Sequence, residues 1–271
     1  MTFKYFLSIA IPPHIALYYL YRQIPGFFHS VLNICLSNQE NYFYYLFSEG
    51  EAILINQVNV FLQSHFKDLV LEPPLFYSWN YGLRFEIADP IKWNEKGGMN
   101  QAYERSTTLF NEVFAKEDNI IFVTDVHTFK SNKYLQKRPL NVYSKFIKSK
   151  QKLYQLSHQT LPELEEEEGV THRFSLICKK AEIRYASLLK AICHEDMGDS
   201  QTILRGDRRI GYNIYLINHT KQMIYHLYDD RGCDIIAASK QNLHAIYRNY
   251  NHWLLDYDRE KMASLFSPSN K

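Results

Sequence analysis

The segment YHLYDDRGCDIIA, residues 225–237, places Asp229, Asp230, Arg231 and Asp234 within six positions, between two apolar runs. Carboxylate oxygens gathered in this way can bind Mg²⁺ or a similar hard cation, and one of them could act as a general acid or base. The same residues also suit a charged turn, with Asp229 first and Gly232 fourth in a type I turn. In both interpretations we expect the carboxylates to be open to solvent or to a bound molecule.

A cation site or an acid–base pair would need further groups from elsewhere in the chain. The candidates are Glu86, the pair Asp125 and His127, and the HEDMGD stretch with His194, Glu195, Asp196 and Asp199. HEDMG is not the HExxH zinc-protease motif, because its fifth residue is Gly198. The chain also contains no Walker A loop, GxGxxG, GxSxG elbow or CxxC pair, so the sequence implies no cofactor and favours a non-enzymatic role.

The elements that position these groups follow from hydrophobic periodicity. Helical spacing predicts helices near residues 58–66, 102–114, 183–192 and 243–254, with Ser239 as a plausible N-cap of the fourth, and a short last helix after residue 258. Strands are predicted at 81–87, 120–126, 172–180, 212–217 and 222–228, and the charged turn leads into another. The last two listed strands flank a four-residue loop typical of hairpins. We therefore predict an α+β fold, a single compact domain with a hairpin-containing antiparallel sheet packed by helices.

Alternation within YGLRFEI assigns two more polar residues to one surface. Leu83, Phe85 and Ile87 alternate with Arg84 and Glu86, which is the pattern of a strand buried on one side only. We therefore expect Arg84 and Glu86 to share the outer face.

Composition changes near residue 51. The first fifty residues contain four charged and thirteen aromatic side chains, whereas the net charge of the whole chain is +2. We expect residues 1–51 to be an accessory extension or the result of a start codon assigned too early, and residues 52–271 to form the domain. Residues 5–21 contain Pro12 and Pro13 and are too short for a transmembrane helix, and no secretory leader is evident. The four scattered cysteines then indicate reduced thiols and a cytoplasmic protein.

Residues 128–170 are expected to form a surface excursion. Residues 130–162 contain eight Lys and Arg and no acid, and an acidic run follows at once. Tyr134, Tyr143, Phe146 and Tyr154 are interleaved with the basic residues of 130–154, as in a groove that binds single-stranded nucleic acid. The near-neutral chain makes nucleic acid an unlikely partner, and a solvated surface is the competing interpretation.

Four blocks resemble one family when they are taken together: PPLFYSWNYGLRFEI, YERSTTLFNEVF, INHTKQMIYHLYDDRGCDIIA and LHAIYRNYNHWLLDYDREKMASLF. They are similar to the uncharacterised bacterial domain-of-unknown-function family 3885, over roughly residues 55–266. The resemblance implies a soluble cytosolic protein without an established activity. The residues of the shared blocks that we assign to binding are Trp79, Arg84, Glu86, Asp229, Asp230, Arg231, Asp234, Trp253, Asp256 and Arg259.

Three functions remain open at this point. The first is a module that binds a protein partner, such as an immunity protein for a secreted toxin, through its charged turn and aromatic surface. The second is a metal-assisted hydrolase of phosphodiesters or nucleotides that uses Asp229, Asp230 and Asp234 as ligands. The third is a protein that binds single-stranded nucleic acid through residues 130–154.

Overall fold

The computed structural model describes residues 44–48, 51–89, 96–132, 141–162, 168–195, 204 and 211–267. The chain divides into two units, Met1–Ile55 and Asn56–Lys271. In the first unit, β1 (Tyr44–Ser48) and β2 (Glu51–Ile55) pair antiparallel. The other residues expected to form the extension lie outside the described ranges.

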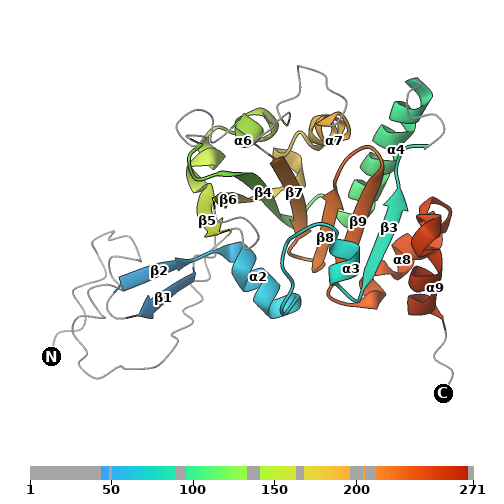
Figure 1. Ribbon diagram of the computed structural model, residues 1–271, viewed down its shortest axis with the longest axis horizontal. Coiled ribbons are helices and arrows are strands. Elements are labelled where there is room, and N and C mark those ends of the chain that lie inside the picture. Colours follow the sequence, from blue (N-terminus) through green and yellow to red (C-terminus); the bar gives the residue numbers. More distant parts are fainter. Residues whose placement is uncertain are drawn as a thin grey trace. The chain divides into compact units, whose positions relative to one another are not determined.

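Seven strands of the second unit form one sheet in which every neighbouring pair is antiparallel. In spatial order they are β3 (Gly82–Glu86), β9 (Gly232–Ala237), β8 (Met223–Leu227), β7 (Gly211–Asn218), β4 (Asn119–Phe129), β6 (Gly169–Lys179) and β5 (Ser157–Pro162). Helices pack against this sheet (Figure 1). The predicted α+β fold is confirmed.

Both faces of the sheet are covered, and this explains the continuous apolar runs of its central strands. One face, here called the α2 face, carries Ile121 and Ile224 and packs against α2 (Gln57–His65) and α3 (Leu75–Ser78). The other, the α4 face, carries Phe122 and Tyr225 under α4 (Lys96–Val113), α7 (Tyr185–Cys193) and α8 (Lys240–Tyr250). A polar residue on either face of a central strand is therefore buried.

The helices α2, α4, α7, α8 and α9 (Arg259–Phe266) occur near the positions that periodicity predicts, whereas α3 and α6 (Asn141–Phe146) were not predicted. Ser239 is the N-cap residue of α8, although its side chain makes no capping hydrogen bond. After α8, the 3₁₀ turns η4 (Asn251–Trp253) and η5 (Asp256–Asp258) lead into α9. This segment runs beside β3, because Leu254 bridges Phe85 and the Leu255 amide donates to the Arg84 carbonyl at 3.0 Å. The outer edge of β3 is thereby covered.

The expectation of a surface excursion over residues 128–170 is wrong for much of its described part. β4 extends to Phe129, and β5 is a strand of the main sheet. α6 (Asn141–Phe146) buries Val142, Tyr143 and Phe146 in the core, and η1 (Gln151–Gln155) follows it. The basic residues concealed this pattern, because only one side of so short a helix is apolar.

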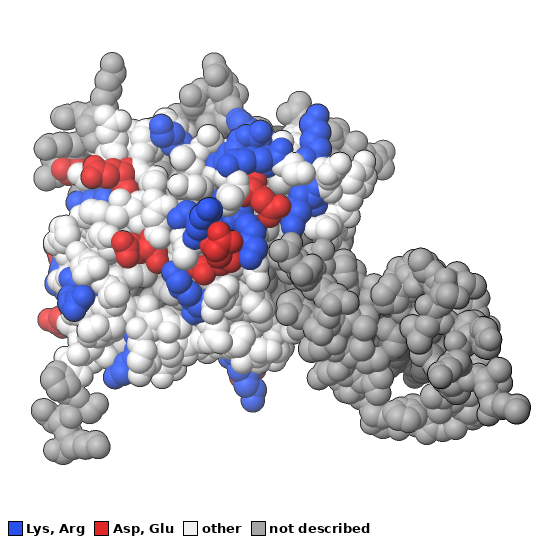
Figure 2. Space-filling view, turned by 180° about the vertical axis from the view of Figure 1, so that it is seen from behind, with Lys and Arg blue, Asp and Glu red and all other residues white. Residues whose placement is uncertain are grey.

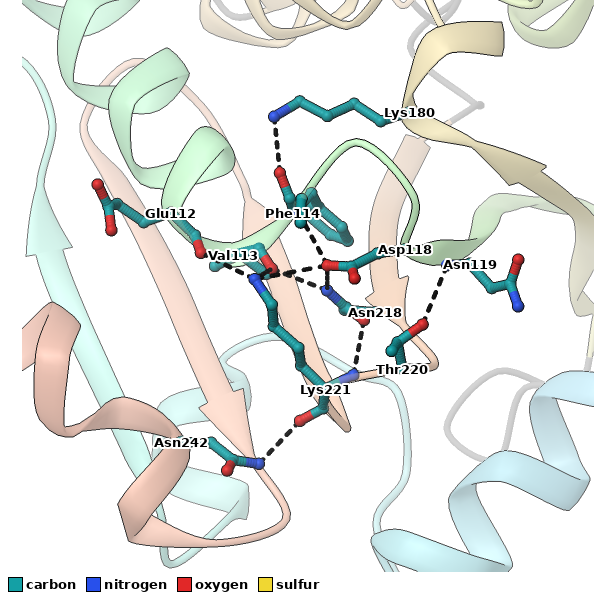
Figure 3. Close-up of polar contacts among 11 residues, drawn as sticks. Glu112, Val113, Phe114, Asp118, Asn119, Lys180, Asn218, Thr220, Lys221 and Asn242 are labelled. Carbon is teal, nitrogen blue, oxygen red and sulfur yellow. Dashed lines mark hydrogen bonds and ion pairs between the residues drawn. The ribbon is translucent and has the colours of Figure 1, made fainter.

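Lysine side chains cap the carboxyl end of α4 by binding backbone carbonyls there (Figure 3). Lys180 donates to the carbonyl of Phe114 at 2.6 Å, and Lys221 donates to that of Val113 at 3.0 Å. Asn218 joins them by donating to Val113 at 2.8 Å and to Asp118 at 2.7 Å. Cations at the negative end of the helix dipole stabilise the helix. The cluster anchors α4 to the β7–β8 turn and is fully explained by this structural role.

No helix within the described ranges is long and apolar enough to cross a membrane. The three described cysteines, Cys178, Cys193 and Cys233, are buried and free.

We expect residues 56–271 to fold without the first unit, because both described hydrophobic clusters begin at or after Val58. The shortened chain should melt in one cooperative transition, with a midpoint within about 4 °C of that of the full chain, the shift that 1 kcal/mol causes at this size. Circular dichroism melting of the two proteins measures this. A broad, non-cooperative melt of the shortened chain would show that the first unit belongs to the folding unit.

Candidate functional site

Arg84 and Asp234, two residues assigned to binding, form a buried ion pair on the α2 face. They are direct partners across β3 and β9. Arg84 donates from Nε and Nη2 to the two carboxylate oxygens at 2.7 and 2.8 Å, and the Phe76 amide donates to Asp234 at 3.1 Å. Asp234 is 0% exposed. Arg84 and Glu86 do share one face, but α3 covers that face at Arg84, so the expectation that Arg84 lies on the outside is wrong.

Aromatic rings surround the Arg84 guanidinium. Its central carbon lies 4.7 Å from the ring centroid of Tyr77, 5.4 Å from that of Phe76 and 5.7 Å from that of Tyr228. Gly232 makes room for one of these rings, because a Cβ at this position would overlap the hydroxyl and ring of Tyr228. Gly232 of the YDDRG block therefore allows the Tyr228 ring to lie against the backbone, in addition to suiting the fourth position of the turn.

The other two aspartates of the turn are also buried, so the expectation that the carboxylates are open to solvent is wrong. Asp229 accepts from the backbone amide and Nε of Arg231, both at 2.7 Å, and also from its Nη2. Residues after β3 cover the turn, since the amides of Ile87 and Ala88 donate to the carbonyls of Arg231 and Asp230. Only the Arg231 side chain, 72% exposed, reaches solvent.

The three aspartates of the turn do not converge on one point. Asp234 binds Arg84 and Asp229 binds Arg231, so the oxygens of these two residues are already occupied by arginines. Among the described residues, no group of three or more His, Cys, Asp or Glu could hold a metal ion. This geometry gives no support to the hydrolase hypothesis, which requires a shared set of carboxylate ligands.

Asp125 and His127, two candidates to complete a cation site or an acid–base pair with the turn, have other partners away from it. Asp125 forms a buried bidentate ion pair with Arg173 across β4 and β6, at 2.8 and 2.6 Å. His127 binds Thr171 through Nδ1 and the Asn213 amide through Nε2, both at 2.8 Å. Its two ring nitrogens are therefore occupied.

The HEDMGD stretch begins close to the turn. Its His194 caps α7 and is hydrogen-bonded to the Tyr103 hydroxyl of α4. The adjacent Cys193 is buried, and its thiol pKa is raised to about 12, first by burial and then by the negative charge of Asp230. Such a thiol stays protonated and unreactive at neutral pH. Asp196 and Asp199 lie outside the described residues.

His226 is a buried polar residue that the periodicity did not single out. It lies opposite Asp234 in the pairing of β8 with β9, and its ring centroid is 4.7 Å from that of Tyr215. Neither ring nitrogen has a hydrogen-bond partner among the described residues. The only signal in the sequence is a histidine inside the otherwise apolar run MIYHLY, which a half-buried strand would explain equally well.

The other residues assigned to binding lie in or beside the segment that follows α8 or next to the edge strand β3. Trp79 is partly buried and donates its indole N–H to the Ala237 carbonyl at 2.7 Å. Arg105 donates to the carbonyl of Glu86 at 2.8 Å and lies 5.3 Å from the ring centroid of Trp253. Asp256 is exposed and accepts from Arg259 at 2.8 Å.

We define the η5 corner as Tyr77, Asp256, Tyr257, Glu260 and Lys261. Tyr257 is 88% exposed, and Tyr77 is also exposed. The corner is held from beneath, because the Tyr77 hydroxyl donates to buried Asp258 at 2.8 and 2.9 Å. Arg259 fixes the preceding loop by donating to the carbonyls of Asn251 and Leu254 at 3.0 Å. It is thus an exposed aromatic surface on a fixed backbone.

Basic side chains gather on another part of the domain. Lys145, Lys148 and Lys150 are exposed around α6, and Arg184 binds the carbonyls of Lys145 and Ile147 at 3.0 and 3.1 Å. Figure 2 shows lysines and arginines grouped on this side, with fewer acidic residues among them. Of the four interleaved aromatic residues, Tyr143 and Phe146 are core residues and Tyr134 lies outside the described ranges. Tyr154 is 93% exposed.

The antiparallel sheet, covered by helices on both faces and crossed by the buried pairs Arg84–Asp234 and Asp125–Arg173, defines a single α+β domain. The chain belongs to the family described as Domain of unknown function (DUF3885), which it matches over residues 58–258. It is 32% identical to the uncharacterized protein YnaE of Bacillus subtilis (strain 168) over 208 residues, which are 73% of this chain and 96% of that protein. Comparison with solved structures found no match.

Proposed function

We propose that the protein is a cytosolic binding module whose η5 corner engages a basic protein partner. The exposure of Tyr257 beside Asp256 carries the proposal, because exposed tyrosines on a fixed backbone supply contact area at little cost in conformational entropy. Two of the three charged residues of the corner, Asp256 and Glu260, are acidic, which favours a basic partner. The third, Lys261, has its ammonium 4.4 Å from the Phe76 ring centroid, in a cation–π contact within the protein. An immunity protein that binds a basic secreted toxin is one form of this proposal.

The corner replaces the charged turn as the proposed contact surface. Buried Asp234 supports the corner indirectly, since it binds Arg84, and the carbonyl of Arg84 accepts from the amide of Leu255, one residue before Asp256. Trp253, Asp256 and Arg259 remain assigned to the binding region, Asp256 as a contact residue and the other two as supports. Arg231 is a further exposed candidate.

A photoreactive amino acid placed at position 257 of the full chain, in the native host, tests this assignment. We expect one discrete protein adduct, and the purified partner should bind the Asp256→Lys variant at least about tenfold more weakly, a change of 1.4 kcal/mol. Position 154 is the matched control, because Tyr154 is as exposed as Tyr257 but belongs to η1 beside β5, the opposite edge strand. The same adducts from both positions, or an unchanged affinity of the Asp256→Lys variant, would refute the proposal.

The control position also probes the nucleic-acid hypothesis. The nucleic-acid hypothesis is still supported by the basic surface around α6 (Figure 2) and by the exposed Tyr154. Adducts from position 154 that nucleases remove would favour this function.

A further inference from the structure

Two histidines meet between the edge strand β5 and its neighbour β6. His158 Nε2 and His172 Nδ1 lie 3.3 Å apart. In the register of the two strands, His158 is opposite Phe174 and His172 is opposite Thr160. The histidines are therefore diagonal neighbours on one face of the sheet, an arrangement in which long side chains can touch.

Their separation is compatible with a shared metal ion as well as with a long hydrogen bond. Two nitrogens on a tetrahedral Zn²⁺, each bound at about 2.0–2.1 Å, lie about 3.3–3.4 Å from one another. Hydrogen bonds with an N–H donor are usually shorter, with a mode of about 2.9–3.0 Å. The observed 3.3 Å matches the first geometry.

The surroundings hold both rings in place and leave one side open. The His158 ring stacks on Phe174, with centroids 4.7 Å apart and planes at 26°. His172 is buried in β6, whereas His158 is exposed on the edge strand. A neutral imidazole is the form of histidine that binds a metal ion.

We propose that His158 and His172 are the two protein ligands of a Zn²⁺ site at the β5 edge of the sheet. Two coordination positions remain for water or for a group from another molecule, because the described residues offer no third protein ligand. The bound ion joins the edge strand β5 to β6. This site is independent of the η5 corner, which lies near the opposite edge strand, β3.

Zinc titration of the full chain by calorimetry tests the proposal, with the wild type compared with His158→Ala and His172→Asn. We expect each variant to bind one equivalent of Zn²⁺ fewer than the wild type. His252→Ala is the matched control, since His252 is also exposed but lies beside Trp253, and it should keep the full stoichiometry. Zn²⁺ should also raise the melting temperature of the wild type more than that of His158→Ala, because binding to the folded state stabilises it.

Equal stoichiometry in the wild type and His158→Ala would overturn the proposal. It would also be overturned if the wild type bound no Zn²⁺ at about 100 μM, because a site with a dissociation constant well above this concentration stays largely empty. His158→Ala decides the result if His172→Asn fails to fold, because the exposed His158 side chain is not part of the hydrophobic core.

Discussion

Replacing Asp234 with alanine is expected to lower the free energy of unfolding by about 3–5 kcal/mol, the usual cost of removing one partner from a buried ion pair. The change leaves the Arg84 guanidinium buried without its bidentate acceptor. Arg84 cannot avoid this cost by losing its proton, because an arginine side chain remains protonated in proteins. The Phe76 amide loses its acceptor as well. Urea unfolding followed by circular dichroism measures the difference.

Asp256→Ala is the matched control, because this aspartate also binds an arginine within a block shared by the family. Its side chain is 90% exposed, so we expect a loss of no more than about 1 kcal/mol. The double variant Arg84→Met with Asp234→Leu should recover most of the stability lost in Asp234→Ala, since apolar replacement of both partners removes the unpaired charge. Equal losses in the two single variants would show that burial does not distinguish the pairs.

Periodicity was sufficient to predict the strands and helices that bury a continuous stripe or alternate regularly. β3 was predicted from the alternation of Leu83 and Phe85, and the stripe of α8 from Leu243 and Ile246. Alternation does not show whether the polar face of a strand is covered. The cover over Arg84 is α3, a four-residue helix after two prolines that is too short to show a period. This is why Arg84 and Asp234 were assigned to an exposed site.

Pairing across the sheet was also hidden from the sequence. Asp234 contacts Arg84 150 positions away, and Asp125 contacts Arg173 48 positions away. Only the strand register brings these residues together. β5 gave no signal of its own, because SHQTLP is an edge strand with little apolar alternation, so the approach of His158 to His172 could not be predicted. The exposed corner was partly predictable, since Asp256 and Arg259 were assigned from the shared block.

Replacing His226 with phenylalanine is expected to raise stability at pH 7 by about 1–3 kcal/mol and to remove part of the loss of stability in acid. The first effect arises because two buried ring nitrogens without partners among the described residues are replaced by carbon. The planar ring keeps its contact with Tyr215, whose centroid is 4.7 Å away. Urea unfolding at pH 7 gives this difference directly.

The acid effect follows from the pKa of His226, which is about 3 in the folded protein, chiefly because of burial and secondly because of the charge of Arg84. In the unfolded chain the pKa of histidine is about 6.5. Above pH 6.5 the ring is neutral in both states and the group does not affect the pH dependence. Between about pH 6.5 and 3 only the unfolded chain takes up the proton, so the wild type loses about 1.4 kcal/mol of stability for each pH unit from this group.

The His226→Phe variant lacks this contribution, so its stability should fall less steeply than that of the wild type between pH 6.5 and 4.5. The difference in slope does not depend on how well the larger ring packs, because a packing cost is the same at every pH. His244→Phe, which replaces an exposed histidine by the same ring, is measured beside it as the control for the substitution itself. Identical slopes in His226→Phe and the wild type would mean that His226 is protonated within the folded sheet, which would require Arg84 and the covering helices to move away from it.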